Sequence, residues 1–181
     1  MGMRHSVLRL SDRETVLLSR LAEPWLAVAL SDQTVRIQLG EHTVITLTSE
    51  GVDVAPFFEC FRLNVSSSRR AVVGEPPLGF RTGAEVIQVL ESEEWLARER
   101  LPPRSLVGDF IGSHCRAAPG NAPVNVEHSC IVDCGVLFTA SSGQQLLIRC
   151  ATTPCWLAVI QDDKTIEKEL GEHRLRDLTN S

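Results

Sequence analysis

The sequence contains two copies of a similar segment, and this repeat constrains the fold more than any other feature. Residues 25–42, WLAVALSDQTVRIQLGEH, align without a gap on residues 156–173, WLAVIQDDKTIEKELGEH, and ten of the eighteen positions are identical. The match extends upstream, so that the copies span about residues 15–42 and 145–173. Unrelated segments rarely agree this often, and we therefore infer an internal duplication.

Two copies are too few for a solenoid, in which about three or more repeats stack to cover one another's apolar faces. We expect a pseudo-twofold pair instead, in which each half contributes an apolar sheet face and the two halves close one core. Such a core predicts equivalent, paired positions for Trp25 and Trp156. With 43% hydrophobic and 23% charged residues, residues 1–181 suit a single compact domain.

Alternating apolar and polar residues, bounded by turn-forming residues, predict that most regular structure is β. The predicted strands lie at residues 16–18, 26–30, 34–39, 43–48, 57–65, 131–138, 144–149 and 156–160. Residues 140–143, Ala-Ser-Ser-Gly, indicate a hairpin turn. Glu59 falls on the apolar face of its strand, which suggests a sheet edge or a bulge.

Two segments show helical spacing, so the predicted fold class is α+β, mostly β, with an inserted central helix. Thr82 and Glu85 have capping-box spacing, and apolar residues then recur near helical period over about 82–100. In the second copy, residues 165–170 predict a short helix, which Asp162 or Asp163 could cap, where the first copy predicts a strand. Residues 66–80 form the predicted linker, and 104–127 a long loop with a short element around 107–111.

The predicted central helix would carry the most acidic surface of the chain, and on it we place a partner-binding site. Its candidate residues are Glu91, Glu93, Glu94 and Trp95. Tryptophan is enriched among the residues that dominate binding energy, and carboxylates would steer a neutral or basic partner. The alternative is an ordinary solvated helix face.

Histidine and cysteine residues supply weak candidates for a metal site. The repeated Gly-Glu-His triplets place His42 and His173 at equivalent positions, which a twofold could bring together. His128 and Cys130 begin a second group, which Cys134, Cys150 and Cys155 complete. The cysteine spacings do not match a zinc knuckle, and the triplets also suit turns that face water. We therefore expect reduced, buried thiols and no metal or other cofactor. Disulfides between Cys150 and Cys155 or between Cys130 and Cys150 stay open for an oxidised protein.

Enzyme motifs give little support for catalysis. His114 and Cys115, with Asp109 nearby, could pair a thiol with a base, but adjacent side chains usually point apart. The chain has no glycine-rich phosphate loop, no GxSxG and no HExxH. We therefore expect a protein that is not an enzyme.

Charge and hydropathy exclude several classes of partner. The net charge of −5 disfavours nucleic acids and anionic membranes, because both need clustered Lys and Arg. No segment is apolar over the length of a bilayer, so we expect a cytoplasmic protein. The first hypothesis is a non-catalytic protein-binding domain, such as a bacterial immunity protein or antitoxin that occludes a partner's site.

Two further hypotheses remain from the sequence. One is a small-molecule- or metal-binding protein, or an unclassified enzyme, whose site lies at the seam between the repeats. The other is a structural subunit of a larger assembly, for which a homodimer is the simplest form.

Overall fold

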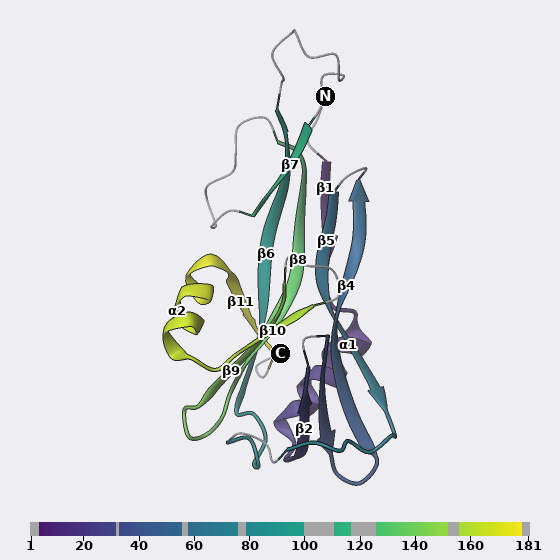
Figure 1. Ribbon diagram of the computed structural model, residues 1–181, viewed down its shortest axis with the longest axis vertical. Coiled ribbons are helices and arrows are strands. Elements are labelled where there is room, and N and C mark those ends of the chain that lie inside the picture. The colour runs from purple at the N-terminus through teal and green to yellow at the C-terminus, as the bar shows by residue number, and fades with distance from the viewer. Residues whose placement is uncertain are drawn as a thin grey trace.

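Long β-strands dominate the computed structural model, as Figure 1 shows. The structure describes residues 4–31, 33–55, 58–75, 79–99, 111–116, 126–151 and 156–178. Within these ranges, the seven-stranded sheet contains β1 (Arg4–Leu8), β6 (Val86–Glu99), β7 (Ile111–Arg116), β8 (Val126–Thr139), β9 (Gln145–Cys150), β10 (Leu157–Ile160) and β11 (Arg174–Asp177). The four-stranded sheet contains β2 (Trp25–Leu30), β3 (Thr34–Leu39), β4 (Thr43–Ala55) and β5 (Phe58–Ser68). The mostly-β, α+β class that the sequence predicts is confirmed.

The two sheets have different connectivity. The four-stranded sheet runs in chain order, β2-β3-β4-β5, and all its pairs are antiparallel. The seven-stranded sheet has the order β10-β9-β8-β6-β11, with β7 added to β6 and β1 added to β8. The β1–β8 pair is parallel. Strands β6 and β8 are therefore the long central pair on which the rest of this sheet is assembled (Figure 1).

The main hydrophobic core lies between the sheets. It combines apolar side chains of β3, β4 and β5 with those of β6, β8 and β9. Three buried aromatic rings meet within it: Trp25, Phe80 and Phe138. Burying each large side chain of this kind contributes about 1.5–3 kcal/mol, so the inter-sheet core is the main source of stability.

Helix α1 (Asp12–Ser19) closes one edge of the four-stranded sheet. Ser11 and Glu14 form a capping box at its N-terminus. The same Glu14 carboxylate accepts a hydrogen bond from the backbone N–H of Val65, 3.2 Å away on the edge strand β5. The helix is followed by a single 3₁₀ turn, Arg20–Ala22, which leads into β2. An exposed strand edge invites pairing with other chains, so α1 protects this one.

Helix α2 (Asp163–Glu172) belongs to the second hydrophobic cluster. Asp162 caps it by accepting a hydrogen bond from the backbone N–H of Thr165, at 2.8 Å. Its buried Ile166 packs in a cluster with Leu90, Leu137 and Leu147 of the seven-stranded sheet. The short helix predicted at 165–170 is therefore confirmed, as is its aspartate cap. No helix among the described residues is long and apolar enough to cross a membrane.

Several predicted strands are confirmed, although their ends differ. Those at 26–30, 34–39, 43–48, 57–65, 131–138, 144–149 and 156–160 lie in β2, β3, β4, β5, β8, β9 and β10. The hairpin turn at 140–143 is confirmed, and Gly143 adopts a positive φ of 82° there. Glu59 lies on an edge strand next to a register shift at Asp53/Ala55, as its position on the apolar face suggested.

The predicted central helix at 82–100 is wrong, because Val86–Glu99 form β6. The error arises because β6 is buried on both faces of its sheet. Val89 packs in the inter-sheet core while its neighbour Leu90 packs in the cluster around α2. A register shift after Leu90 then changes the alternation. A strand covered on both sides lacks a clean two-residue period and can imitate helical spacing.

Three smaller predictions also change. Residues 16–18 lie in α1 and not in a strand. The predicted linker at 66–80 begins too early, because β5 continues to Ser68. The predicted loop at 104–127 lies largely outside the described residues, apart from β7 and the start of β8.

The two copies of the repeat do not form the same elements. The first copy contains the end of α1, then β2 and β3, whereas the second contains β9, β10 and α2. Trp25 is 2% exposed but Trp156 is 45% exposed, so the predicted paired tryptophan core is wrong. The strand at 34–39 and the helix at 165–170 differ as the sequence predicts. The duplication and its pseudo-twofold axis stay predictions.

Candidate functional site

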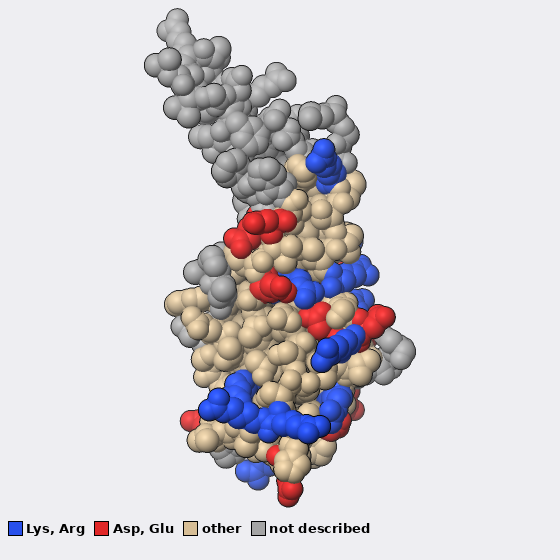
Figure 2. Space-filling model, turned by 90° about the vertical axis from the view of Figure 1, so that its right-hand side faces the viewer, with Lys and Arg blue, Asp and Glu red and all other residues tan. Residues whose placement is uncertain are grey.

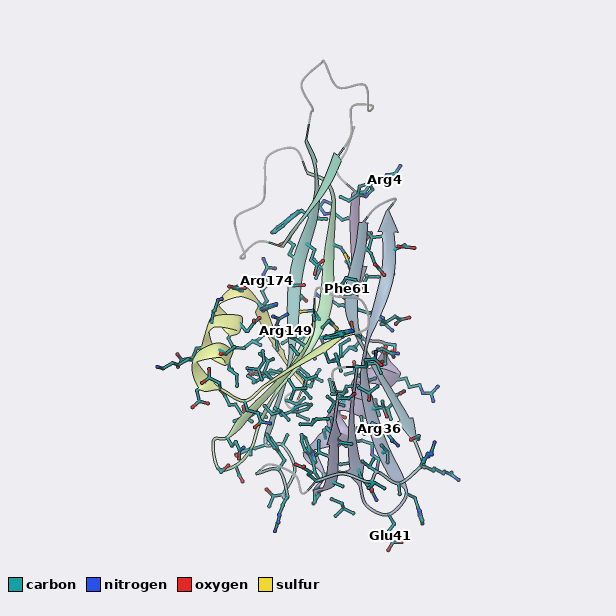
Figure 3. All side chains as sticks on the ribbon, viewed as in Figure 1. Arg4, Arg36, Glu41, Phe61, Arg149 and Arg174 are labelled. Atoms are coloured by element: carbon teal, nitrogen blue, oxygen red, sulfur yellow. The ribbon has the colours of Figure 1, made fainter. Side chains whose placement is uncertain are left out.

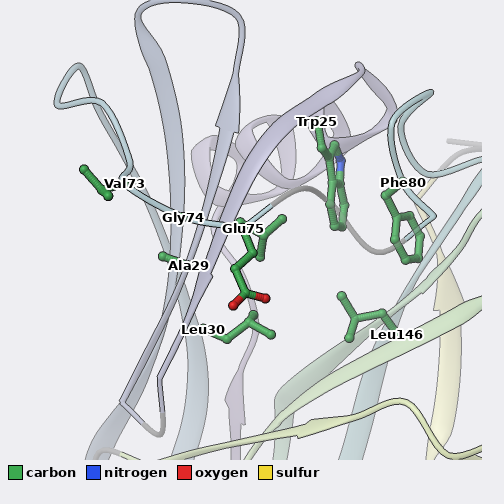
Figure 4. A pocket seen from close by; sticks show the side chains of 9 residues that line it. Trp25, Ala29, Leu30, Val73, Gly74, Glu75, Phe80 and Leu146 are labelled. Atoms are coloured by element: carbon green, nitrogen blue, oxygen red, sulfur yellow. The ribbon is translucent and has the colours of Figure 1, made fainter.

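A pocket opens where the edge of the four-stranded sheet meets the seven-stranded sheet. Its volume is about 330 Å³. Strand β2, the segment at 73–75, Phe80 and β9 line it (Figure 4). The lining residues are Trp25, Val28, Ala29, Leu30, Val73, Gly74, Glu75, Phe80 and Leu146. We call this the β2 pocket. Its size falls at the lower end of the range for small-ligand sites.

The aromatic wall of the β2 pocket is held by three contacts. The Trp25 and Phe80 rings stack with centroids 4.5 Å apart and planes inclined by 17°. Phe138 meets Trp25 edge to face, with centroids 5.3 Å apart. The indole Nε1–H of Trp25 donates to the carbonyl oxygen of Leu21 at 2.8 Å. This satisfied, packed indole provides a rigid surface for a ligand.

Glu75 is placed at the β2 pocket by its backbone. Its N–H donates to the Val28 carbonyl oxygen at 2.9 Å, and the Val28 N–H donates back at 3.0 Å. Gly74 makes this close approach feasible, since a Cβ there would lie 2.5 Å from the Val28 carbonyl oxygen. In Figure 4 the Glu75 carboxylate points toward Leu30 and away from the Trp25 ring.

The β2 pocket combines apolar surface with a single negative charge. Of its lining residues, Glu75 alone carries a charged side chain. Two apolar side chains extend the pocket outward to solvent: Leu30 is 43% exposed and Val73 fully exposed. The lining residues include no cysteine, serine or histidine. The arrangement therefore suits binding of an apolar group with a positive charge, and its lining residues offer no thiol, hydroxyl or imidazole group for catalysis.

The acidic residues predicted to bind a partner are dispersed on β6. Glu91 pairs with Arg9 at 2.8 Å, and Glu93 lies 3.9 Å from Arg174. Glu94 is only 1% exposed and Trp95 only 3% exposed. Trp95 is therefore not an exposed anchor, and the predicted acidic helix face does not exist. Sequence reasoning failed here because the face depended on the wrong secondary structure.

The two histidines of the Gly-Glu-His triplets lie apart. His42 is in the turn between β3 and β4, with its side chain 84% exposed. His173 follows α2 and is 7% exposed, and its Nδ1 donates to the Glu169 carbonyl oxygen at 2.6 Å. Figure 3 labels Glu41, the neighbour of His42, at the bottom of the molecule, far from α2. The structure does not bring the triplets together.

The remaining candidate metal ligands form no cluster in the part of the chain that is described. Within it, no group of three or more His, Cys, Asp and Glu side chains has geometry for a metal ion. His128 and Cys130 lie two positions apart on β8. Cys60, Cys130, Cys134 and Cys150 are buried, as the sequence predicts for these thiols. Asp109 and Cys155 lie outside the described residues, as do the side chains of His114 and Cys115.

Asp133 and Glu14 are buried carboxylates that hold neighbouring segments together, and the sequence did not predict these roles. Asp133 accepts from Arg176 at 2.7 Å and from the Leu10 N–H at 2.8 Å. Burial raises the pKa of Asp133, and these two partners oppose the shift. Its only local signal is a charge within the apolar run of β8. Glu14 is held by Arg62, whose guanidinium lies 3.2 Å away.

Charge is unevenly distributed on the face that carries β4 and β5. Figure 2 shows acidic and basic side chains mixed at mid-height and a band of basic side chains lower down. On the lower part of this sheet, Arg36 donates to the carbonyl oxygen of Arg70 at 3.2 Å. The net negative charge therefore does not describe every surface of the molecule.

Comparisons with known proteins add no assignment. No protein-family model, no curated protein and no solved structure matches the chain. The functional argument rests on the geometry described above.

Proposed function

We propose that this chain is a non-catalytic protein-binding domain, and that the β2 pocket receives an apolar, positively charged side chain of its partner. The supporting observation is that Glu75 lines the same pocket as the stacked Trp25 and Phe80 rings and is its one charged residue. A carboxylate attracts cations, and the apolar lining favours a hydrocarbon stem. Arginine or lysine on a partner has this combination of features.

A protein partner is favoured over a free small molecule by the apolar side chains around the β2 pocket. Leu30 and Val73 line the pocket and are exposed, and Leu26 on the same strand is 53% exposed. A ligand of pocket size would leave much of this surface in water, whereas a partner surface would cover it. The proposed mechanism is steric occlusion of the partner's own site, with the charge of Glu75 orienting it.

The proposal keeps the neutral or basic partner that the sequence predicts and moves the contact from β6 to the β2 pocket. An inhibitor of a bacterial toxin is one more specific form of it, and that form rests on composition alone. An assembly of identical copies is a different prediction, which light scattering after size-exclusion chromatography tests.

The experiment is a selection of displayed random peptides on the full chain, followed by affinity measurements on variants. We expect enrichment of Arg or Lys next to apolar residues. Glu75→Gln should weaken the selected peptides about tenfold, because one charge-assisted contact contributes about 1.5 kcal/mol. Glu85→Gln is the matched control, since Glu85 is exposed and does not line the pocket.

Nuclear magnetic resonance locates the contact. The indole N–H signal of Trp25 should shift when a selected peptide is added, while that of Trp156 should not. If the selection enriches peptides without a basic residue, this pocket is not the site. The same conclusion follows if the wild type and Glu75→Gln bind the selected peptides equally well.

A further inference from the structure

Three arginine side chains gather at the outer face of the four-stranded sheet. Arg36 is on β3, and Arg69 and Arg70 directly follow β5. We call these three residues the arginine patch. Arg36 Nη2 donates to the carbonyl oxygen of Arg70 at 3.2 Å, and the backbone N–H of Val72 donates to Gln38 Oε1 at 3.0 Å. These two hydrogen bonds hold the chain that follows β5 beside β3, and they fix the patch in place.

The strand register extends the face of Arg36 across the whole sheet. Arg36 is directly opposite Ala29 on β2 and Thr46 on β4, and Thr46 is opposite Ser66 on β5. Directly opposite residues share one face of a sheet. The residues on either side of Arg36 along β3 are buried in the core. The four positions therefore form a row on the outer face, and this row begins at the β2 pocket, which Ala29 lines.

The two neighbouring rows on this face carry no charge. They contain Ala27, Gln38, Val44 and Ser68 on one side, and Thr34, Thr48 and Asn64 on the other. The next carboxylate along β4 is that of Glu50, which already accepts a hydrogen bond from Arg62 at 2.8 Å. These rows therefore surround the arginine patch with hydroxyl, amide and small apolar groups.

Other arginines of the described chain have a carboxylate partner. Ion pairs with N–O distances of 2.7–3.9 Å are formed by Arg9, Arg20, Arg62, Arg149, Arg174 and Arg176. The arginine patch forms no ion pair with any described residue. Like charges that are held together without a counter-charge repel one another, and a bound anion relieves this repulsion.

We propose that the arginine patch is an interaction surface for an acidic segment of a partner protein. The patch lies on the lower part of the sheet, where Figure 2 shows a band of basic side chains. A guanidinium group binds a carboxylate through two parallel hydrogen bonds, so Asp or Glu residues of the segment fit the patch. The hydroxyl and amide groups of the neighbouring rows can bind the polar backbone of the same segment.

A nucleic acid also carries anionic groups, but this face fits it less well. The three rows contain no aromatic side chain on which a base could stack. The net charge of −5 repels a long polyanion, whereas a short acidic segment is exposed mainly to the local positive charge. These observations favour a protein partner.

The proposal goes beyond the contact at the β2 pocket and does not depend on it. Because Ala29 lines the pocket and is opposite Arg36, one partner can contact both surfaces. Such a partner would place a basic side chain in the pocket and carboxylates on the arginine patch, and its contact surface could be neutral overall. The two contacts are measured with different probes, so either proposal can fail while the other stands.

The test measures binding of fluorescein-labelled hexaglutamate to the full chain by fluorescence anisotropy. Hexaglutamine with the same label is the uncharged control. We expect only hexaglutamate to bind at low salt, and its affinity should fall at least about tenfold between about 20 mM and 200 mM sodium chloride, because salt screens exposed charges. The proposal is overturned if hexaglutamate does not bind, or if the two peptides bind equally well.

Variants locate the contact. Arg70→Gln removes a charge from an exposed side chain whose guanidinium has no hydrogen bond within the described chain, so the variant should fold. We expect it to bind hexaglutamate about fivefold more weakly than the wild type. Arg36→Lys keeps the charge but cannot form the two parallel hydrogen bonds, so its affinity should be intermediate between those of the wild type and Arg70→Gln.

The matched control is Arg4→Gln. Arg4 is also exposed and forms no ion pair with the described residues, and Figure 3 labels it far from Arg36. This control should change the affinity by less than about twofold, because the charges are separated by more than a screening length. Equal weakening by Arg4→Gln and Arg70→Gln would overturn the proposal. Tighter binding of hexathymidylate than of hexaglutamate would also overturn it, because the patch would then prefer phosphates.

Discussion

Trp25 and Phe80 stack with ring centroids 4.5 Å apart, although one begins an edge strand and the other lies in an irregular segment. Phe80 is fully buried, and its carbonyl oxygen accepts a hydrogen bond from the backbone N–H of Trp25 at 3.3 Å. The same two rings serve as core and as the wall of the β2 pocket. Stability and binding are therefore coupled at this position.

Removing the Phe80 ring should destabilise the protein and disrupt the pocket. We expect Phe80→Ala to lower the free energy of unfolding by about 3–5 kcal/mol, because it leaves a cavity against two aromatic neighbours. Urea unfolding measures this. Val73→Ser also alters the pocket lining, but Val73 is fully exposed and should change stability by less than about 0.5 kcal/mol. If both variants lowered the free energy of unfolding by similar amounts, the stacked Trp25 and Phe80 rings would not be central to stability.

Gly74 should tolerate no side chain. In Gly74→Ala the new Cβ would lie 2.5 Å from the Val28 carbonyl oxygen, which is backbone and cannot move aside cheaply. We expect the two hydrogen bonds between Val28 and Glu75 to break, with faster amide hydrogen exchange at both residues. Gly171→Ala in α2 is the control, because open space surrounds that Cβ. That control should stabilise the protein by about 0.5–1 kcal/mol.

Glu14 should make stability depend on pH. Burial raises the pKa of Glu14, but hydrogen bonds from Ser11 and Val65 and the charge of Arg62 outweigh it, so the net pKa lies below the ordinary value of 4.5. A lowered folded-state pKa gives stability that is present above the unfolded pKa and is lost as pH falls through the folded one. We expect Glu14→Gln to be about 1–3 kcal/mol less stable at neutral pH.

The wild type and Glu14→Gln should become closer in free energy of unfolding as the pH falls below about 4.5. Chemical unfolding at several pH values measures it. Glu41→Gln, at a side chain that is 90% exposed, should show no such trend. A constant difference at every pH would mean that Glu14 acts through packing and not through its charge.

Asp133 should be a sensitive position in the seven-stranded sheet. Asp133→Ala would leave the Leu10 N–H without its acceptor and Arg176 without its carboxylate. Breaking a buried ion pair costs about 3–5 kcal/mol, and the partial exposure of Arg176 puts this one at the lower end. If the melting temperature of Asp133→Ala matched that of the wild type, the pair would contribute nothing to stability.

Local chemistry predicted those elements that the structure confirms most closely. Asp162 caps α2 because a short acceptor before a helix satisfies the first free N–H groups, whatever lies around it. Gly143 closes the β8–β9 hairpin because it adopts a positive φ without strain. Both signals act within a few residues, and for this reason they can be identified in the sequence.

The candidate site could not be predicted in this way. Glu75 carries no motif, and its importance arises from pairing with Val28, far away in the sequence. Glu94 and Trp95 looked like an exposed acidic face only while their segment was taken as a helix. These residues lie instead in β6, paired with β7 and β8, and both side chains are buried.

The sequence by itself determined a mostly-β chain with a capped second helix, a glycine hairpin and buried thiols, because these follow from local backbone preference and hydrophobicity. Tertiary structure decided that Val86–Glu99 is a strand, that Trp25 is buried while Trp156 is exposed, and that Glu75 pairs with Val28. These outcomes depend on which distant strands pair. Strand pairing is fixed by the energy of the whole core, and a local segment carries only part of that information.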